Sequence, residues 1–338
     1  MEWVGVELTT VANDHAVVHD GFDVHVYRDL APDTLHRFDG FEFRTLPEPG
    51  EHLCTFATVN DVHFGETECG VIEGMELGPI YSSEPGEPPY PETMNNGAIA
   101  EMLRADPAVV VVKGDLTAGG SREEYDCFLA HYRGAFGERL HHVRGNHDAY
   151  HGQTFAADAP IEIELPGVRL AVLDTVIPRE TPGQVSTEQL QWLDELAERS
   201  DTPVLVFGHH HVWSPDSNVR PENYFGINPD DSERLVEVFV RRPALSGFFA
   251  GHTHRNRVRR LSATGEVPWV EVACTKDFPG SWAEYRVFDG GILQIHHRIS
   301  NPEALAWTER TRDMYGGIYF DYAFGELSER CFVVWPRG

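Results

Sequence analysis

Positive charge is scarce in this chain. Its 338 residues include 27 Lys and Arg against 54 Asp and Glu, a formal net charge of −27, and the only lysines are Lys113 and Lys276. So acidic a surface repels a phosphate backbone, and a basic groove for nucleic acid has too few residues to form. We therefore expect no nucleic-acid partner and attribute the acidity to a highly soluble surface.

Long apolar runs and cysteine pairs are missing as well. No segment is long and apolar enough to span a bilayer, and the first twenty residues have neither the basic cluster nor the apolar core of a signal peptide. The five cysteines are widely spaced, without a Cys-x-x-Cys pair, which is typical of reduced thiols. We expect a globular, cytoplasmic protein without membrane association.

Residues 1–50 have the pattern of a small β-rich unit. Short alternating segments such as Val24-His-Val-Tyr27 precede the turn-rich stretch Leu46-Pro-Glu-Pro-Gly50. The pattern Leu30-x-Pro-x-Thr34, before an aromatic-rich strand, resembles the fibronectin type III sandwich, although fifty residues are too few for that whole domain. We predict a boundary at residue 50.

Residues 51–300 have the pattern of a layered α/β domain, because apolar runs of strand length alternate with segments of helical periodicity. The capping-box spacing of Ser186 and Gln189 predicts one helix, and apolar periodicity predicts another over 232–241. The last strands of the domain are expected to form a second sheet built by hairpins. Strands are expected at 53–60, 108–113, 139–144, 168–174, 203–208, 246–251, 258–261, 269–274, 284–288 and 292–297.

Two further segments accompany this domain. Residues 66–92, rich in Gly, Pro and Glu, are a long insertion after the first strand, the kind of loop that often serves as a lid. Residues 301–338 are a C-terminal extension with a helix expected at 302–313 and then an aromatic-rich stretch. Three roles stay open for this extension: covering the core, closing the site, or making an oligomer contact.

Five of the expected strands end in a short burst of Asp, Asn or His. Because the carboxyl ends of strands in an α/β sheet converge on one crevice, these distant residues are expected to meet there. The bursts are Asn60-Asp-Val-His63, Lys113-Gly-Asp115, Arg144-Gly-Asn-His-Asp148, Gly208-His-His-His211 and Gly251-His-Thr-His254.

Taken singly, each of these residues fits a turn, a helix cap or a solvated side chain. Taken together, donors drawn only from Asp, Asn and His at five strand ends indicate a metal-binding cup. Oxygen and nitrogen ligands without thiolate favour Mn, Fe, Co or Zn over calcium or a structural zinc.

In this order, the motifs resemble the signature of the calcineurin-like metallophosphoesterases over roughly residues 53–275. The resemblance implies an α/β fold, a four-layer αββα sandwich of two mixed sheets flanked by helices, with a dinuclear metal centre at the strand ends. Asp61-x-His63 with Gly145-Asn-His-Asp148 is most similar to the cyclic-nucleotide and glycerophosphodiester phosphodiesterases. His63 and Ala118 stand where purple acid phosphatases have a glycine and a metal-bound tyrosine. Gly114-Asp-Leu-Thr-Ala-Gly-Gly120 departs from the Gly-Asp-x-Val-Asp-Arg-Gly of the protein phosphatases.

By this resemblance, seven side chains would hold two divalent cations. Gly208 aligns the family's single-histidine motif on His209, whereas His210 and His211 occupy positions that are usually not ligands. Asp61, His63 and His254 would bind one ion, Asn146, His209 and His252 would bind the other, and Asp115 would bridge both.

The resemblance also implies roles beside the metal ligands. His147 would stabilise a phosphoryl oxygen or protonate the leaving group. Asp148 would orient His147 through its other ring nitrogen, or else would cap a turn. For the substrate, the candidates at the mouth of the crevice are Arg144, His210 and Tyr224.

The expected function is hydrolysis of a small organic phosphodiester by attack of a hydroxide that bridges the two ions. Two dications less two aspartates and one hydroxide leave a local charge of roughly +1, which would attract a small phosphorylated substrate to an acidic protein. A phosphomonoesterase using the same site is the first alternative. A noncatalytic, metal-containing interaction scaffold is the second, and the undamaged motifs favour catalysis over it.

Overall fold

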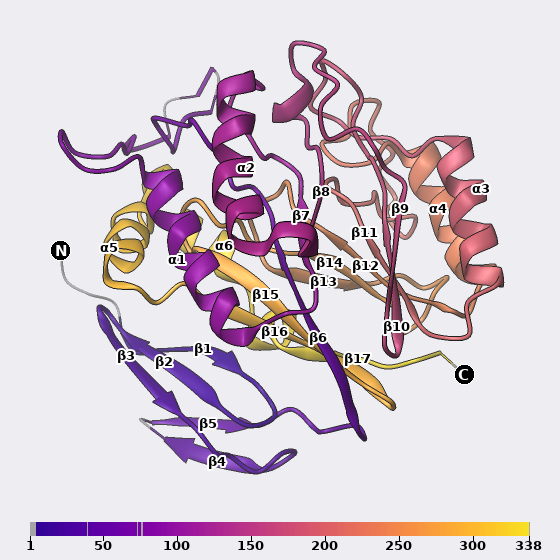
Figure 1. Ribbon diagram of the computed structural model, residues 1–338, viewed down its shortest axis with the longest axis horizontal. Helices are drawn as coiled ribbons and strands as arrows, with labels where there is room; N and C mark the ends of the chain where they lie inside the picture. Colours follow the sequence, from indigo (N-terminus) through magenta and orange to yellow (C-terminus); the bar gives the residue numbers. More distant parts are fainter. Residues whose placement is uncertain (1–4, 39, 73, 76, 338) are drawn as a thin grey trace.

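Two six-stranded sheets lie at the centre of the molecule, with helices on their outer faces (Figure 1). The computed structural model describes residues 5–38, 40–72, 74–75 and 77–337. Both sheets combine parallel and antiparallel neighbours, so the predicted architecture of two mixed sheets flanked by helices is confirmed.

The order of strands across each sheet shows where the parallel pairs lie. The first sheet runs β17 (Phe332–Val334), β16 (Gly291–Arg298), β15 (Ser281–Phe288), β6 (His52–Val59), β7 (Val110–Lys113) and β8 (Leu140–Val143). The second runs β13 (Arg257–Arg260), β14 (Pro268–Glu271), β12 (Leu245–Ala250), β11 (Val204–Phe207), β10 (Val168–Val172) and β9 (Ile161–Leu165). Strands β6, β7 and β8 are parallel to one another, and so are β10, β11 and β12.

Apolar side chains between the sheets and under the helices form the core. Phe56 and Tyr285 stack at 4.6 Å between ring centroids, and Phe207 of the second sheet meets the edge of Phe56 at 6.0 Å. Strands β7 and β11 are buried along their whole length, which explains the apolar run of β11 and of the first three residues of β7, because a parallel strand covered on both faces has no polar side. The last residue of β7, Lys113, is buried with its amino group donating to the Ala250 carbonyl at 3.1 Å.

Helices cover the outer face of each sheet. On the first sheet these are α1 (Tyr90–Ala105), α2 (Arg122–Phe136) and α5 (Pro302–Thr311). On the second they are α3 (Thr187–Glu198) and α4 (Pro229–Arg241). The Ser186 hydroxyl accepts a hydrogen bond from the Gln189 amide at the start of α3, as its capping spacing predicts. None of the helices in the described residues is long and apolar enough to cross a membrane.

The prediction of a separate second sheet after residue 255 is wrong. Strands β13 and β14 join the sheet of β12, whereas the hairpin of β15 and β16 pairs with β6 in the other sheet. An antiparallel hairpin can extend whichever sheet edge is free, and its own sequence does not specify which.

The N-terminal residues form five strands in two small antiparallel sheets. Strands β1 (Glu7–Val11), β2 (Ala16–Asp20) and β3 (Asp23–Tyr27) make one sheet, and β4 (Leu35–Phe38) and β5 (Phe41–Arg44) the other. The unit is tied to the first sheet, since the Thr10 hydroxyl donates to the His296 carbonyl at 2.7 Å. The boundary at residue 50 and the likeness to fibronectin type III stay predictions, and residues 1–4 and 39 lie outside the described residues.

Of the three roles predicted for the C-terminal extension, covering the core is confirmed and closing the site stays a prediction. Helix α5 packs against α1, and β17 adds to the edge of β16, so part of the extension covers the core. Between them, α6 (Tyr319–Phe324) contributes side chains to a cavity described below, and α7 (Leu327–Arg330) packs beside β1. An oligomer contact stays a prediction.

Candidate metal centre

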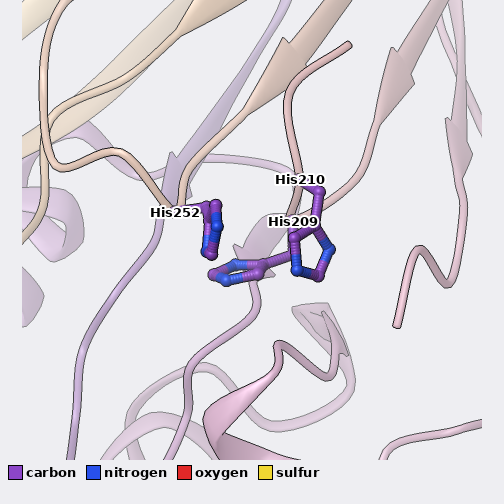
Figure 2. Close-up of side chains that lie close together, drawn as sticks. All are labelled: His209, His210 and His252. Carbon is purple, nitrogen blue, oxygen red and sulfur yellow. The ribbon is translucent and has the colours of Figure 1, made fainter. Parts of the chain in front are cut away.

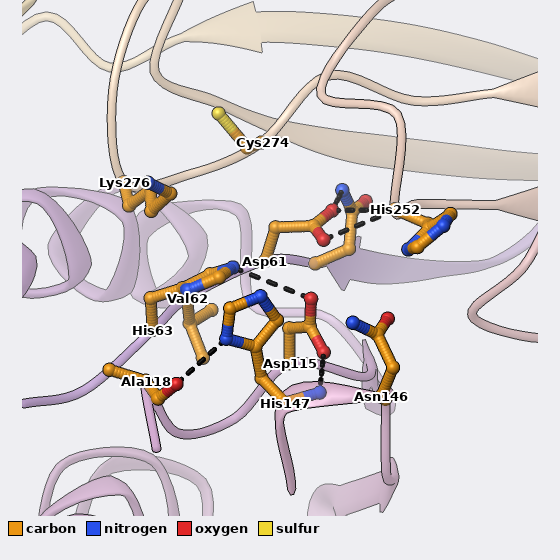
Figure 3. Close-up of polar contacts among 12 residues, drawn as sticks. Asp61, Val62, His63, Asp115, Ala118, Asn146, His147, His252, Cys274 and Lys276 are labelled. Atoms are coloured by element: carbon orange, nitrogen blue, oxygen red, sulfur yellow. Dashed lines mark hydrogen bonds and ion pairs between the residues drawn. The ribbon is translucent and has the colours of Figure 1, made fainter. Parts of the chain in front are cut away.

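The polar bursts at the strand ends meet at one place, as predicted. Figure 3 labels residues of the bursts that follow β6, β7, β8 and β12. The ligand atoms of Asp61, His63 and His254 all lie within 4.8 Å of one another. The same holds for Asp61, Asp115 and His209. The loop after β8 joins them, since Asn146 Oδ1 lies 3.0 Å from His209 Nε2. The loops after β6, β7, β8, β11 and β12 therefore deliver donors to a single centre, because the parallel strands of each sheet place their carboxyl ends on one edge and the two edges lie together.

The backbone is left-handed at most of these donors. Five of the seven predicted ligands have positive φ, namely Asp61 (53°), His63 (46°), Asp115 (49°), His252 (67°) and His254 (56°). This conformation costs about 1–3 kcal/mol per non-glycine residue and persists where the surroundings require it. Here it turns the chain sharply after β6, β7 and β12.

Glycine beside the ligands lets these loops approach closely. A Cβ atom on Gly145 would lie 2.2 Å from Asp115 Oδ1, and one on Gly251 would lie 2.7 Å from Asp61 Oδ2. Any larger residue would push either carboxylate out of place. The glycines of the motifs are thus needed for space around the two aspartates.

Asp115 lies between the two predicted ligand sets. Its Oδ2 is 3.5 Å from His63 Nε2 and 3.3 Å from His209 Nε2, so one oxygen faces a histidine of each set. Its Oδ1 accepts a hydrogen bond from the His147 amide at 3.0 Å. This is the position that a bridging carboxylate requires.

The three ligands predicted for the second ion, Asn146, His209 and His252, also lie close to one another. Asn146 Oδ1 lies 3.0 Å from His209 Nε2, while its Nδ2 donates to the Tyr150 hydroxyl, which leaves the amide oxygen facing the centre. The ring of His252 is 5.0 Å from that of His209. His252 Nε2 donates to the Phe225 carbonyl at 2.7 Å, so Nδ1 is its free nitrogen.

The ring of His210 packs beside His209 and His252 (Figure 2), but both of its nitrogens have other hydrogen-bond partners. Its Nε2 donates to the Thr181 carbonyl at 3.0 Å, and its Nδ1 lies 2.8 Å from the Thr175 hydroxyl. The side chain is fully buried. The structure therefore contradicts the prediction of His210 as a substrate contact and supports His209 as the donor of this motif.

The chemistry of the donors fits a divalent cation. Both ring nitrogens of His63 are buried without a hydrogen-bond partner among the described residues, which a metal bond to one of them would explain. Burial opposes charge on Asp115 and His209, yet the imidazoles hold the pKa of Asp115 well below its usual range, and that carboxylate raises the pKa of His209 to about 9. A bound cation would replace the imidazole proton and would supply the positive charge that the Asp115 carboxylate attracts.

His147 stands at the edge of the centre with a fixed ring. Its Nδ1 donates to the Ala118 carbonyl at 2.7 Å, because a carbonyl can only accept. The ring lies 4.6 Å from that of His63, and the side chain lines the cavity. The other nitrogen, Nε2, is left to face the centre.

The predicted link from Asp148 to the ring of His147 is wrong. Asp148 accepts from the amides of Leu116, Thr117 and Gly145 at 3.0, 2.8 and 2.7 Å, and from the Thr117 hydroxyl at 2.6 Å. Its carboxylate is fully used in joining the loops that carry Asp115 and Asn146. Its role is to hold these two loops in register, which is closer to the alternative of a turn cap.

A cavity of about 680 Å³ opens over the centre. Asp115, Asn146, His147, His252 and His254 form its floor. Its walls come from the insertion at 66–92, of which residues 73 and 76 lie outside the described residues, and from the C-terminal extension. The insertion thus borders the site, and its role as a lid stays a prediction.

Comparison with known proteins decides the family. A family model described as calcineurin-like phosphoesterase matches residues 54–256, which is more than half of the chain. The chain belongs to this family. The matched segment contains all seven predicted ligands and His147, and groups of Asp and His side chains that could hold a metal ion lie where its strand ends converge.

Relatives agree with the predicted branch. A probable glycerophosphodiester phosphodiesterase from Arcobacter nitrofigilis is 26% identical over 249 residues, which cover 67% of this chain and 86% of the relative. A probable cyclic nucleotide phosphodiesterase from Synechococcus is 25% identical over 205 residues, covering 58% and 78%. The crystal structure of a dimetal phosphatase from Danio rerio, 16% identical, covers 85% of this chain and all of its own with a TM-score of 0.55, which shows a shared fold.

Two further predicted substrate contacts of this phosphoesterase are wrong. Arg144 pairs with Asp174 at 2.7 Å and is buried outside the described lining of the cavity. The Tyr224 hydroxyl donates to the Val212 carbonyl, and its ring packs against His211. The carboxylate of Asp174 neutralises Arg144. Its hydrogen bond to Val212 and its packing on His211 hold Tyr224 outside the described lining of the cavity.

A buried cluster of charged side chains lies beside His63 and was not predicted from the sequence. Glu66 Oε2 lies 3.4 Å from His63 Nδ1, and neither atom has a hydrogen-bond partner among the described residues. Lys276 Nζ holds the other oxygen of Glu66 at 2.8 Å and lies 3.2 Å from Asp277. Burial opposes the charge, but Lys276 holds the pKa of Glu66 below its usual value, so the carboxylate faces the ring ionised. The only hint was that Lys276 is one of two lysines.

We expect Glu66→Gln to weaken metal binding about 10–100-fold, the usual loss when a carboxylate behind a histidine ligand is removed. The carboxylate fixes the ring of His63 and strengthens it as a donor, whereas an amide does neither well. Titration of the metal-free protein against a chromophoric chelator measures this affinity. Glu68→Gln is the matched control, since Glu68 is exposed two positions away, and equal affinities for both variants would contradict the role.

Proposed function

We propose that this phosphoesterase hydrolyses a small organic phosphodiester at a centre that holds two divalent cations. Bound there, the cations would supply an activated water and offset the charge of the phosphoryl group. Asp61, His63 and His254 would hold one, and Asn146, His209 and His252 the other. The observation that carries the proposal is the position of Asp115. One of its two carboxylate oxygens, Oδ2, lies 3.5 Å from His63 Nε2 and 3.3 Å from His209 Nε2.

His147 is the residue of this chain best placed to handle a proton. The Ala118 carbonyl fixes the tautomer and the plane of the ring, which directs Nε2 to the floor of the cavity. From there Nε2 can donate to a phosphoryl oxygen or to the departing alkoxide. The hydrogen bond between His147 and Asp115 runs through the backbone amide, and a ring nitrogen of His147 lies within 4.8 Å of ligand atoms of His63 and Asp115, beside the place where the phosphoryl group would bind.

The lining of the cavity favours a diester over a monoester. The lining that the structure describes contains no lysine and no arginine. A monoester dianion brings a second negative charge, which this lining offers no cationic side chain to match, whereas a diester brings one. The monoesterase stays the second candidate because the centre itself serves either reaction.

A noncatalytic scaffold would be free to lose groups that only chemistry requires. Here the predicted Asp and His ligands fall in groups that could hold a metal ion, Asn146 Oδ1 lies 3.0 Å from His209 Nε2, and His147 is held by a 2.7 Å hydrogen bond with one nitrogen left over. Such preservation supports an enzyme.

The test combines metal analysis with two colorimetric substrates. We expect the purified chain to bind two equivalents of Mn, Co, Ni or Zn and to hydrolyse bis(p-nitrophenyl) phosphate faster than p-nitrophenyl phosphate. Faster turnover of the monoester would favour the second candidate. Turnover of neither substrate with two metals bound would favour the scaffold.

A further inference from the structure

The wall of the cavity differs in chemistry from its floor. The floor consists of the polar residues of the centre, whereas Val71, Leu77, Ile318, Tyr322 and Phe225 stand above it. These five side chains carry no formal charge, and four of them have no polar atom. A substrate held at the floor by its phosphate therefore meets an apolar surface with one of its ester groups.

These apolar side chains are exposed to an unusual degree. Ile318 is 65% exposed, Val71 55% and Phe225 51%, although they lie close to one another around one opening. Single exposed apolar residues are normal in proteins, but a contiguous group around a cavity marks a surface that a ligand covers. Binding of such a ligand would bury these side chains, and the burial of apolar surface favours binding.

The wall is held in place by contacts between its two segments. Arg310 in α5 donates to the Ser82 carbonyl at 3.0 Å and pairs with Glu84 at 3.2 Å, which joins the extension to the insertion. Tyr319 donates to Asp277 at 2.7 Å beneath the wall. The wall also starts directly at the centre, since Phe225 stacks on His252 at 4.1 Å.

We propose that the site selects phosphodiesters in which one ester group is bulky, apolar and uncharged, and that this group packs on the wall formed by Val71 and Leu77 of the insertion, Ile318 and Tyr322 of the C-terminal extension, and Phe225. This inference rests on the proposed function. Two sources supply such a group, an aryl ring and a hydrocarbon chain. Tyr322 and Phe225 can pack against a ring, and Val71, Leu77 and Ile318 can cover a chain.

The test measures binding of three diesters that share one charge and one phosphate. Dimethyl, dibutyl and diphenyl phosphate are titrated into the metal-loaded protein by calorimetry. We expect the Kd of dibutyl or diphenyl phosphate to be about 10–100-fold below that of dimethyl phosphate, because each buried methylene adds to affinity. Tighter binding of the diphenyl ester points to an aryl group, and tighter binding of the dibutyl ester to a hydrocarbon.

Variants connect the preference to the wall. Ile318→Ser and Leu77→Ser alter exposed side chains, and each is expected to weaken binding of the dibutyl and diphenyl esters severalfold more than binding of dimethyl phosphate. Phe22→Ser is the control, because Phe22 is 65% exposed on the N-terminal unit, outside the cavity lining.

Equal Kd values for the three diesters would overturn the inference, as would a preference that survives both wall variants. Failure of the proposed function has a different signature. The protein would then bind the diesters with or without preference but leave bis(p-nitrophenyl) phosphate intact.

Discussion

Asp115→Asn is expected to lower kcat for bis(p-nitrophenyl) phosphate by about 10³-fold or more, and to reduce the metal content of the purified protein. Its Oδ2 is the oxygen that faces a histidine of each ligand set. An amide is neutral, so each of the two cations would lose the negatively charged oxygen that the carboxylate shares between them. Metal ions contribute several kcal/mol to such transition states, and each 1.36 kcal/mol is tenfold in rate. Steady-state kinetics and elemental analysis give the two quantities.

The matched control for this substitution is Asp126→Asn. Asp126 lies on the surface of α2, where it pairs with Arg122, so its loss removes one negative charge without touching the centre. A circular dichroism spectrum equal to that of the parent shows that the fold of each variant is intact. Full metal content with an unchanged kcat in Asp115→Asn would show that this carboxylate does not bridge.

The strands that build the site were predictable to within one or two residues, for a physical reason. Strand β11 was expected at 203–208 and lies at Val204–Phe207, because a strand buried on both faces has to be a short apolar run. The polar residues that follow such runs belong to the end of the sheet where strands converge. Pattern and topology together therefore located the donors, although the assignment to two ions came from the family resemblance.

Helix α1 could not be predicted from its sequence. It contains Asn95, Asn96 and Gly97 in its middle, all weak helix formers. Tertiary contacts compensate, since Asn95 Nδ2 donates to the Val62 carbonyl and Asn95 Oδ1 accepts from the Tyr132 hydroxyl. Those partners are distant in the sequence, and only the folded chain shows them.

The substrate cavity escaped prediction for a related reason. A histidine after a strand has its surroundings set by the strand, whereas a wall residue such as Ile318 reaches the site only through the packing of the C-terminal extension. Arg144 shows the opposite error. It follows a strand directly and looks suited to bind an anion, but Asp174 already neutralises it.

His147→Ala is expected to lower kcat by about 10²–10⁴-fold, the usual contribution of a positioned acid or base, while the metal content stays at its parental value. The metal content is expected to stay because the seven predicted ligands do not include His147, and alanine retains its backbone hydrogen bond to Asp115. The measurement is decisive because a ring nitrogen of His147 lies within 4.8 Å of ligand atoms of His63 and Asp115. The loss should be largest for a diester with an alkoxide leaving group and smaller for p-nitrophenolate, a stable anion that departs without a proton. His151→Ala is the control, since His151 is exposed nearby. Loss of metal from His147→Ala would instead make this histidine a ligand, and a uniform rate loss for all leaving groups would assign it to the phosphoryl oxygens.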